Sequence, residues 1–441
     1  MEKLALLGGT PVIDAEKIPA SLFKWPIITE EDEEVALDVI RNNKFSGTDI
    51  TAQFQDEFAE WQGREYAIAF CNGTAALTAA MYAVGLGKGD EIICPTKTYW
   101  GSVSQAINFG ASAVFCNIDE HLSLDPEDLE RCITPKTKAI MVVHYMSYPC
   151  DMDKIMPIAK KYNLKVIEDV SHAHGVMYKG RKVGTFGDVA AMSMMSMKSF
   201  AAGELGMLVT DDRICYERAM AFGHYERNNE NYIKECEELK PYSHIALGGI
   251  KGRANQLCSA LARVQLKYYD ERTAEIRRAV NYFYDLISDL PGLHPLRVNE
   301  AEGSHMGGYY IPHCYYNPDE LHGLSVKKFC EAVRAEGFKG CWEGANFCLH
   351  THAFFKDFDF RNSGVPSRIE YAERDVREDD GKCERSETIF CCSAPWFKHF
   401  DKEIIELYAK AYRKVVENHE QLLETDADKK QGGRWYGTEN A

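Results

Sequence analysis

Two hydrophobic patterns alternate along the first half of the chain. Apolar runs of strand length occur at residues 66–70 (YAIAF), 91–95 (EIICP), 112–119 (SAVFCNID), 138–145 (KAIMVVHY), 165–170 (KVIEDV), 189–195 (VAAMSMM) and 206–212 (GMLVTDD). Between them, apolar residues recur every three to four positions at 74–84, 102–109 and 151–163. Runs that are apolar throughout are typical of strands buried on both faces. The alternation therefore predicts an α/β fold, with a mostly parallel central sheet and helices on both faces.

The second half of the chain has a different pattern. A long helical stretch begins near residue 256 and ends at Pro291-Gly292, since proline and glycine stop a helix. Shorter strands and helices follow it, with helical stretches at 325–337 and 401–424. We predict three parts: a large domain with an N-terminal segment (1–290), a smaller C-terminal α+β domain (291–424) and a polar tail (425–441), where Trp435 and Tyr436 could contact a partner.

Composition and charge exclude several classes of protein. The chain has 441 residues, of which 45% are hydrophobic, and a formal net charge of -16. Because no run of Lys or Arg accompanies this acidic balance, we expect no nucleic-acid partner. The N-terminus has no apolar core of signal-peptide length, and no segment has the roughly 18 consecutive apolar residues of a membrane helix. We therefore expect a cytoplasmic protein that does not bind a membrane.

Fifteen cysteines are scattered along the chain without a CxxC pair. Their spacing resembles neither a disulfide framework nor a zinc motif, which favours a reduced compartment. Cys391 and Cys392 are adjacent in an apolar run that reads as a buried strand, so we interpret them as structural thiols. We therefore assign no metal site.

Lys198 is the one charged residue in the apolar segment MSMMSMKSF, residues 192–200. An unpaired ammonium costs several kcal/mol to remove from water. Such a lysine therefore reaches the surface, pairs with an acid, or shifts toward its neutral and nucleophilic form. The third option would suit covalent catalysis, but Lys198 by itself does not decide between the three.

A candidate anion site lies at Asn72, Gly73 and Thr74, between a predicted strand and the start of a helix. Free backbone N–H groups and the helix dipole converge on a phosphate at such a position, and the Thr74 hydroxyl could add a hydrogen bond. Asparagine and threonine are also ordinary helix-capping residues, which is the alternative interpretation.

Polar and aromatic residues follow two other predicted strands. Glu168 and Asp169 end one strand, and His172 and His174 come just after it. Strand ends are where open α/β sheets bind ligands, although an acid there can also cap a turn. For the two histidines, one functional and one structural imidazole is a better interpretation than a metal pair. Tyr99, with Trp100 beside it, follows another strand and is either a core residue or a ring that stacks on a flat cofactor.

Together these features match what pyridoxal phosphate (PLP) requires of a protein. Lys198 would form a Schiff base with the cofactor aldehyde. Asp169 would keep the pyridine nitrogen protonated, which lets the ring accept electrons from a neighbouring carbanion. The anion site would hold the phosphate.

Most of the chain resembles the DegT/StrS family of PLP-dependent sugar aminotransferases, within the aspartate aminotransferase superfamily of fold type I. The resemblance rests on ordered motifs: LLGGTPVI, NGTAAL, GDEIICPTKTYW, VVHYMSYPCDMDKI, VIEDVSHAHG, VGTFGDVAAMSM, KSFAAGELGML and GGIKGRANQLCSALARVQL. A serine five residues before Lys198 and a Gly-Glu pair five residues after it are specific to the family.

The resemblance implies a role for each matching position. Lys198 is implied to be the Schiff-base lysine and Asp169 the partner of the pyridine nitrogen. The other implied cofactor contacts are Gly73, Thr74 and Ser193 to the phosphate, Tyr99 stacked on the pyridine ring, and His172 beside the phenolic oxygen, where most members have glutamine.

The chain departs from the family pattern in three places. Leu205 replaces the first glycine of the usual Gly-Glu-Gly-Gly. Lys251 stands where many members have an asparagine that reaches the neighbouring subunit's cofactor phosphate, so Lys251 is either a phosphate-binding residue or a surface lysine. Residues 341–355 resemble the family's substrate-binding segment only loosely.

The implied reaction moves an amino group from glutamate or glutamine to a keto sugar or keto cyclitol, with Lys198 as the general acid and base. The implied assembly is a homodimer with shared active sites. Three alternatives stay open: a sugar dehydratase, whose family members carry histidine in place of Lys198; a cysteine desulfurase, which needs a reactive loop cysteine; and a catalytically silent regulatory protein.

Overall fold

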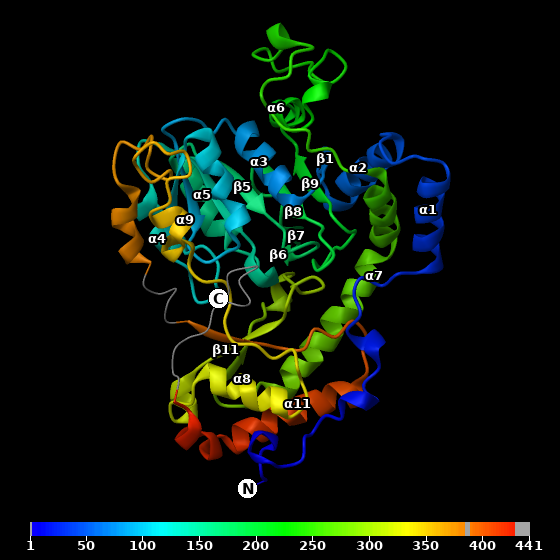
Figure 1. The fold of residues 1–441 in the computed structure, drawn as a ribbon, viewed down its shortest axis with the longest axis vertical. Coiled ribbons are helices and arrows are strands. Elements are labelled where there is room, and N and C mark those ends of the chain that lie inside the picture. The colour runs from blue at the N-terminus through cyan, green and yellow to red at the C-terminus, as the bar shows by residue number, and fades with distance from the viewer. Residues whose placement is uncertain (1, 384–388, 428–441) are drawn as a thin grey trace.

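A computed structural model describes residues 2–383 and 389–427, so most of the predicted tail (425–441), including Trp435 and Tyr436, lies outside the described residues. The upper part of Figure 1 holds a seven-stranded sheet in the order β1-β9-β8-β5-β4-β2-β3. Its strands are β1 (Tyr66–Phe70), β2 (Glu91–Pro95), β3 (Ser112–Cys116), β4 (Thr137–Val143), β5 (Lys165–Asp169), β8 (Val189–Ser193) and β9 (Gly206–Thr210).

The central sheet is mostly parallel, as predicted. Strands β3, β2, β4, β5 and β8 pair in parallel. Strand β9 is antiparallel to both of its neighbours, β8 and β1. Parallel neighbours need crossover connections, and these bring all their carboxyl ends to one edge of the sheet.

Helices cover both faces of the central sheet. One face packs against α3 (Gly73–Ala83) and α6 (Arg213–Gly223), and the other against α2 (Asp49–Gln62), α4 (Pro126–Cys132) and α5 (Met152–Lys161). Along β4, Met141 and Val143 belong to the hydrophobic core on the α3 and α6 face, which we call the first core cluster. Ile140 and Val142 belong to the core on the α2, α4 and α5 face, the second core cluster. Because successive side chains point to opposite faces, both sets must be apolar, which explains the unbroken apolar runs.

The prediction of an α-helix near residues 102–109 is wrong, because this part of the chain forms 3₁₀ helix instead. The structure has two 3₁₀ segments there, Trp100–Ser102 and Ser104–Phe109. Gly110, with φ of 77°, ends the second segment after only six residues. Segments this short favour the tighter i to i+3 hydrogen bonds of a 3₁₀ helix.

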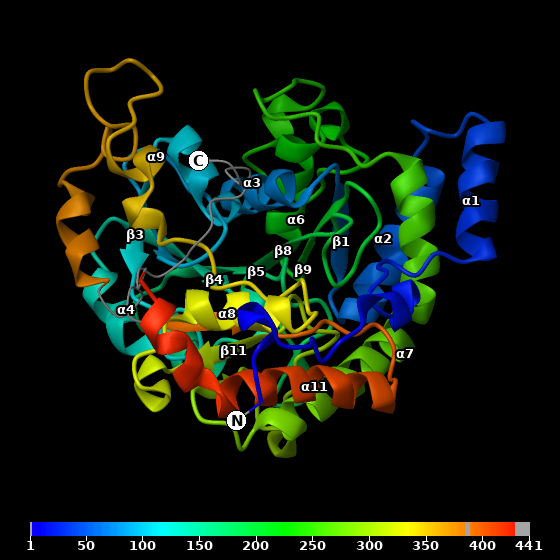
Figure 2. The ribbon, with the colours of Figure 1, turned by 60° about the horizontal axis from the view of Figure 1, so that its bottom comes forward.

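The lower part of Figure 1 holds a small antiparallel sheet in the order β10-β11-β12. Its strands are β10 (Leu293–Pro295), β11 (His313–Tyr316) and β12 (Phe390–Ser393). The long helix α7 (Gln256–Ile287) runs from the central sheet to this small sheet, and α1 (Glu30–Arg41) packs beside its first half (Figure 1). Helices α8 (Val326–Ala335) and α11 (Lys402–Glu417) pack against the small sheet. They lie below it in Figure 1 and come forward in Figure 2, where the bottom of the molecule is turned toward the viewer.

The predicted division at residue 290 stays a prediction, and contacts cross it in both directions. The N-terminal segment lies on the small sheet's helices, where the Ala5 and Val12 N–H groups donate to the Glu336 carboxylate at 2.8 and 3.1 Å. The segment around the short helix α9 (Ala353–Lys356) returns to the central sheet. There Arg368 Nε donates to the Ala113 carbonyl of β3 at 2.8 Å.

A hairpin of β6 (Met177–Tyr178) and β7 (Arg181–Lys182) completes the strands. None of the fifteen cysteines forms a disulfide. Among the described residues, no helix combines the length and the apolar character that a membrane span requires. Cys391 and Cys392 lie buried on β12, as predicted.

Candidate active site

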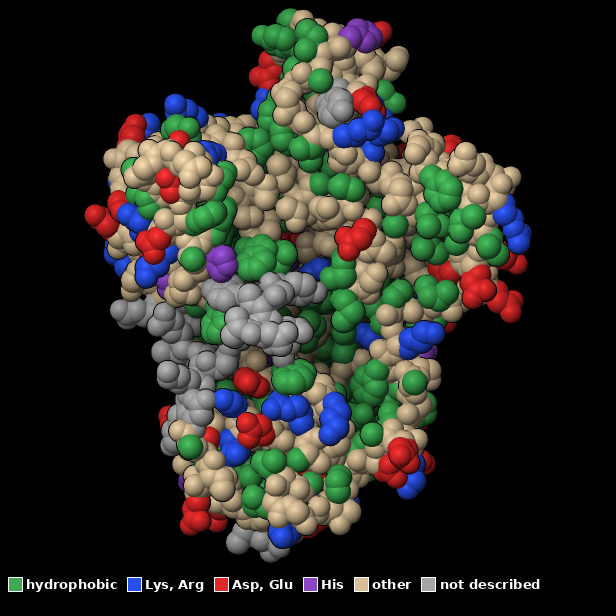
Figure 3. Space-filling model, in the orientation of Figure 1, with side chains coloured by type: hydrophobic (Ala, Val, Ile, Leu, Met, Phe, Trp, Pro, Cys, Tyr) green, Lys and Arg blue, Asp and Glu red, His purple; other side chains and the backbone are tan. Residues whose placement is uncertain are grey.

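The candidate site lies at the edge of the central sheet where the parallel strands end. Asp169 is the last residue of β5 and Ser193 is the last residue of β8. Lys198 lies in the loop between β8 and β9. The molecular surface is hollowed between the central and small sheets, with hydrophobic and basic side chains in the hollow (Figure 3). Strand ends of this kind are where open α/β sheets bind ligands.

The first turn of α3 lies directly against Ser193. Asn72 caps this helix by accepting a hydrogen bond from the Ala75 N–H at 2.8 Å. A Cβ atom added to Gly73 would lie 2.5 Å from the Ser193 Cβ and 2.7 Å from its Cα. Only glycine fits this contact, which brings the free N–H groups of a helix N-terminus next to a serine hydroxyl.

Thr74 and Tyr99 lie beside the same turn. A Cβ added to Gly101 would lie 3.2 Å from the Thr74 hydroxyl oxygen and 2.8 Å from the Tyr99 ring. The structure thus brings together Gly73, Thr74, Tyr99 and Ser193, which come from three separate segments of the chain.

Asp169 is buried and held by two donors. The Ser102 hydroxyl donates to its Oδ2 at 2.7 Å, and the Ser171 N–H donates to its Oδ1 at 3.0 Å. The Ser171 hydroxyl in turn accepts from the Ser193 N–H at 3.0 Å. These bonds link the Asp169 carboxylate to the Ser193 backbone, which packs against α3, and they fix the orientation of the carboxylate.

Lys198 is 8% exposed, and burial lowers its pKa from 10.5 to about 8, while the Asp169 charge opposes the decrease. Its Nζ lies 4.5 Å from the centroid of the Tyr310 ring. Its backbone carbonyl accepts a hydrogen bond from Trp25 Nε1 at 2.8 Å. With this pKa about a tenth of the amine is uncharged and nucleophilic at pH 7, far more than for an exposed lysine.

His172 lies against the Tyr310 ring, with 4.2 Å between the ring centroids. Burial and the nearby Lys198 charge hold its pKa well below the ordinary value, so the ring is neutral. Its Nδ1 accepts from the Met146 N–H at 3.4 Å, which leaves the proton on Nε2. His174 lies deeper, with Nδ1 3.2 Å from the Ser199 hydroxyl, and burial lowers its pKa to about 3.

Glu168 faces away from this site. Its carboxylate accepts from the N–H groups of Gly184, Phe186 and Gly187 and lies 3.0 Å from His144 Nε2. Adjacent strand residues point to opposite faces, so Glu168 holds a loop while Asp169 faces the site.

Lys251 lies apart from the buried group. Its Nζ pairs with Glu226 at 2.6 Å, and its side chain is 52% exposed. The adjacent Gly252 carbonyl accepts from the Cys71 N–H at 2.7 Å, which keeps this segment beside the start of α3. Leu205 is fully buried in the second core cluster, and its carbonyl accepts from the Met194 N–H at 2.8 Å.

Sequence reasoning missed four residues of the site: Tyr310, Trp25, Ser102 and Ser171. Tyr310 and Trp25 lie more than 100 positions from Lys198 and follow no motif used above. Ser102 and Ser171 had a usable signal, because each lies three residues or fewer from a predicted site residue.

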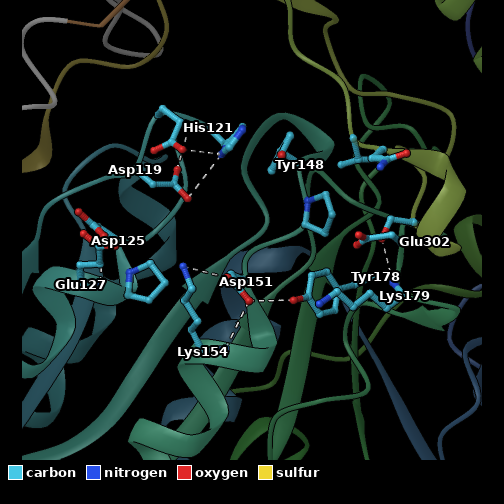
Figure 4. Close-up of a pocket in the computed structure, with 16 residues that line it drawn as sticks. Asp119, His121, Asp125, Glu127, Tyr148, Asp151, Lys154, Tyr178, Lys179 and Glu302 are labelled. Atoms are coloured by element: carbon cyan, nitrogen blue, oxygen red, sulfur yellow. Dashed lines mark hydrogen bonds and ion pairs between the residues drawn. The ribbon is translucent and has the colours of Figure 1, made fainter.

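A separate pocket of about 560 Å³ has Tyr148 in its lining (Figure 4). Tyr148 follows Ser147 in the chain, and the Ser147 hydroxyl donates to the His172 carbonyl at 2.5 Å. This bond links the wall of the pocket to the His172 segment of the candidate site. Six carboxylates and two lysines line it: Asp119, Glu120, Asp125, Glu127, Asp151 and Glu302, with Lys154 and Lys179. Burial raises the pKa of Asp119 to about 7. This acidic lining disfavours an anionic ligand.

Comparisons with known proteins agree with this geometry. Residues 26–338 match the DegT/DnrJ/EryC1/StrS aminotransferase family. The chain is 35% identical over 271 residues to the GDP-perosamine synthase of Escherichia coli O157:H7, covering 61% of this chain and 72% of that protein. It is 30% identical over 360 residues to the "Putative L-glutamine:3-amino-2,3-dideoxy-scyllo-inosose aminotransferase" of Streptoalloteichus tenebrarius, covering 80% and 83%. The crystal structure of an aminotransferase from Psychrobacter cryohalolentis superposes with a TM-score of 0.75 at 27% identity, covering 90% of this chain and 99% of that one.

Proposed function

The chain belongs to the DegT/DnrJ/EryC1/StrS aminotransferase family, and on that basis we propose that it uses PLP to move an amino group from glutamate or glutamine to a keto sugar or keto cyclitol. The observation that supports the proposal is that Lys198 is buried near Asp169, so that burial lowers the pKa of the lysine while the Asp169 charge opposes the decrease.

The residues present fit PLP. The contact between Gly73 and Ser193 leaves no room for a side chain at the start of α3, so backbone N–H groups, the Thr74 hydroxyl and the Ser193 hydroxyl can receive a phosphate. Tyr99, beside Thr74, would cover one face of the ring. When bound, PLP supplies an aldehyde that condenses with amines and a protonated ring that stabilises a carbanion.

Each functional side chain would then have one task. Asp169, held by Ser102 and Ser171, keeps a proton on the ring nitrogen because its negative charge favours the protonated form. His172, whose Nδ1 accepts from the Met146 N–H, would have a proton on Nε2 to donate to the phenolic oxygen. Lys198 would accept a proton at Nζ from the donor's alpha carbon and give one back, because an amine with a lowered pKa can act as both base and acid.

The acceptor class follows from the relatives and from the charge of the site. One relative is named for a GDP-linked sugar and another for an aminoinosose. The acidic pocket with Tyr148 in its lining disfavours a nucleotide diphosphate there. We therefore favour an acceptor without phosphate groups, such as an inosose or a free keto sugar.

The proposed assembly is a homodimer with shared sites, in which Lys251 reaches the partner's phosphate. Its support is that the Lys251 segment lies beside the start of α3 and that Lys251 is half exposed. Mixing inactive Lys198→Ala chains with Lys251→Ala chains tests the idea, because mixed dimers contain one site with both native residues and should recover about a quarter of the activity. No recovery after exchange of subunits would place Lys251 outside the site.

The direct test of the function uses purified protein reconstituted with PLP. We expect visible Schiff-base absorbance that borohydride fixes on Lys198, loss of absorbance when glutamate or glutamine is added, and its return with the right acceptor. Inososes, free keto sugars and nucleotide-linked keto sugars are then compared by release of the donor's keto acid. A protein that stays colourless with PLP, or a Lys198→Ala variant with full activity, would contradict the proposal.

A further inference from the structure

A cluster of two thiols and one carboxylate lies at the β3 edge of the central sheet, opposite the β1 edge. There β3 ends and α4 packs against it. Cys116 is the last residue of β3, and Asp128 and Cys132 lie one turn apart on α4. Both thiols are fully buried, while the Asp128 side chain is 16% exposed. The three ligand atoms, two sulfurs and one carboxylate oxygen, all lie within 4.8 Å of one another.

These distances are close to those of a tetrahedral zinc site. With Zn–S near 2.3 Å and Zn–O near 2.0 Å, ideal tetrahedral geometry separates sulfur from oxygen by about 3.5 Å and two sulfurs by about 3.8 Å. The Asp128 Oδ2 lies 3.5 Å from the Cys116 Sγ and 3.9 Å from the Cys132 Sγ. We propose that Cys116, Asp128 and Cys132 bind a structural zinc ion, a site separate from the aminotransferase chemistry.

A third thiol lies close enough to supply the fourth ligand. Cys383 is buried, and its Sγ lies 3.6 Å from the Phe115 carbonyl oxygen, which the Cys132 Sγ also approaches, at 3.7 Å. The sulfurs of Cys132 and Cys383 therefore surround the same point at the end of β3. Cys383 is therefore our candidate for the fourth ligand, which would give three thiolates and one carboxylate, a donor set that zinc accepts.

Two neighbouring residues hold the Asp128 carboxylate in place. The Asn117 N–H donates to Asp128 Oδ2 at 2.8 Å, and Arg131 binds both carboxylate oxygens at 2.5 and 2.6 Å. Ligating carboxylates are normally oriented by such outer hydrogen bonds. Zinc would replace the protons of the coordinating thiols, and the Arg131 charge would offset part of the negative charge that the thiolates add.

The ion would fasten a returning segment to the edge strand. Residues 366–383 run beside β3, where Arg368 pairs with Asp380 at 2.7 Å and reaches the Ala113 carbonyl. Zinc bound by β3, α4 and Cys383 would join two neighbouring elements to a segment about 250 residues further along the chain. Its loss should therefore lower stability without removing a group from the Lys198 site.

The test is a metal titration of the full chain after treatment with a chelator. We expect one equivalent of Zn²⁺ per chain, measured by elemental analysis after dialysis, and thiolate-to-cobalt charge-transfer absorbance when Co²⁺ is used instead. We also expect the thermal midpoint to rise with Zn²⁺. Asp128→Asn and a Cys116→Ser, Cys132→Ser double variant should lose both signals.

Cys215→Ser is the matched control, because Cys215 is a buried thiol on α6, distant from this cluster, and it should keep full metal binding. Recovery of PLP absorbance at Lys198 reports whether each variant folds. Three results would overturn the proposal: less than one equivalent of zinc in the wild-type chain, unchanged binding in the folded double variant, or a Cys116–Cys132 disulfide found by mass spectrometry in freshly purified protein.

Discussion

Replacing Lys198 with methionine should stabilise the cofactor-free protein. The folded chain holds the lysine at a pKa of about 8, against 10.5 for an exposed lysine. Each pKa unit corresponds to about 1.36 kcal/mol, so burial of this amine costs the fold about 3 kcal/mol. Methionine has a similar shape without the charge and removes that cost.

The sign of the effect with pH follows from proton binding. The unfolded chain keeps the lysine proton up to about pH 10.5, whereas the folded chain releases it near pH 8. The full cost is therefore present below pH 8, and it decreases as the pH rises from 8 to 10.5. Lys198→Met should exceed the wild type by about 3 kcal/mol at pH 7 and by about 1 kcal/mol at pH 9.5.

The assay is thermal unfolding of the two cofactor-free proteins at both pH values. Unfolding entropy scales with chain length, so for 441 residues about 1 kcal/mol moves the midpoint by about 1 °C. We expect a gain of about 3 °C at pH 7 that shrinks to about 1 °C at pH 9.5. Lys339→Met, at an exposed lysine, is the control and should show no pH-dependent difference. A Lys198→Met protein that is no more stable than the wild type at pH 7 would refute the burial argument.

Three further predictions concern the cofactor. Gly73→Ala should weaken PLP binding about 10-fold or more, because the new Cβ would lie 2.5 Å from the Ser193 Cβ and such overpacking costs about 1–3 kcal/mol. A PLP titration measures the change in affinity. Gly381→Ala is the control, because a Cβ at that position has no atom within 4 Å. Asp169→Asn should retain PLP but lower kcat about 100-fold or more, since the ring nitrogen loses its charged partner; an unchanged kcat would remove Asp169 from the mechanism. Tyr310→Leu should lower the pKa of the Lys198 amine by about 0.4–1.5 units, because a ring face near an ammonium contributes about 0.5–2 kcal/mol. Tyr310→Phe keeps that ring face and should leave the pKa unchanged, and the pH dependence of PLP capture distinguishes the two variants.

The sequence by itself determined the central sheet, its helices and the short segments that end at the candidate site. These features are local or repeat along the chain: apolar runs buried on two faces, Asn72 capping α3, and a lysine isolated among apolar residues. Each follows from neighbouring residues, so it can be read without knowing how distant segments meet. The same locality explains the error at 102–109, where a helical periodicity was present but the segment was too short for an α-helix.

Only the tertiary structure decided which side chains share a site. Alternation along β5 required Glu168 and Asp169 to face opposite sides, but only the packing of the loop at Gly184 to Gly187 showed which one faces Lys198. Tyr310 reaches Lys198 because the chain segment that enters the small sheet lies over the edge of the central sheet, a contact between residues 112 positions apart. Cys116 likewise meets Asp128 only through the packing of α4 on β3. Such contacts depend on how helices, strands and loops that are separated along the chain pack together. The local pattern of polar and apolar residues does not specify that packing.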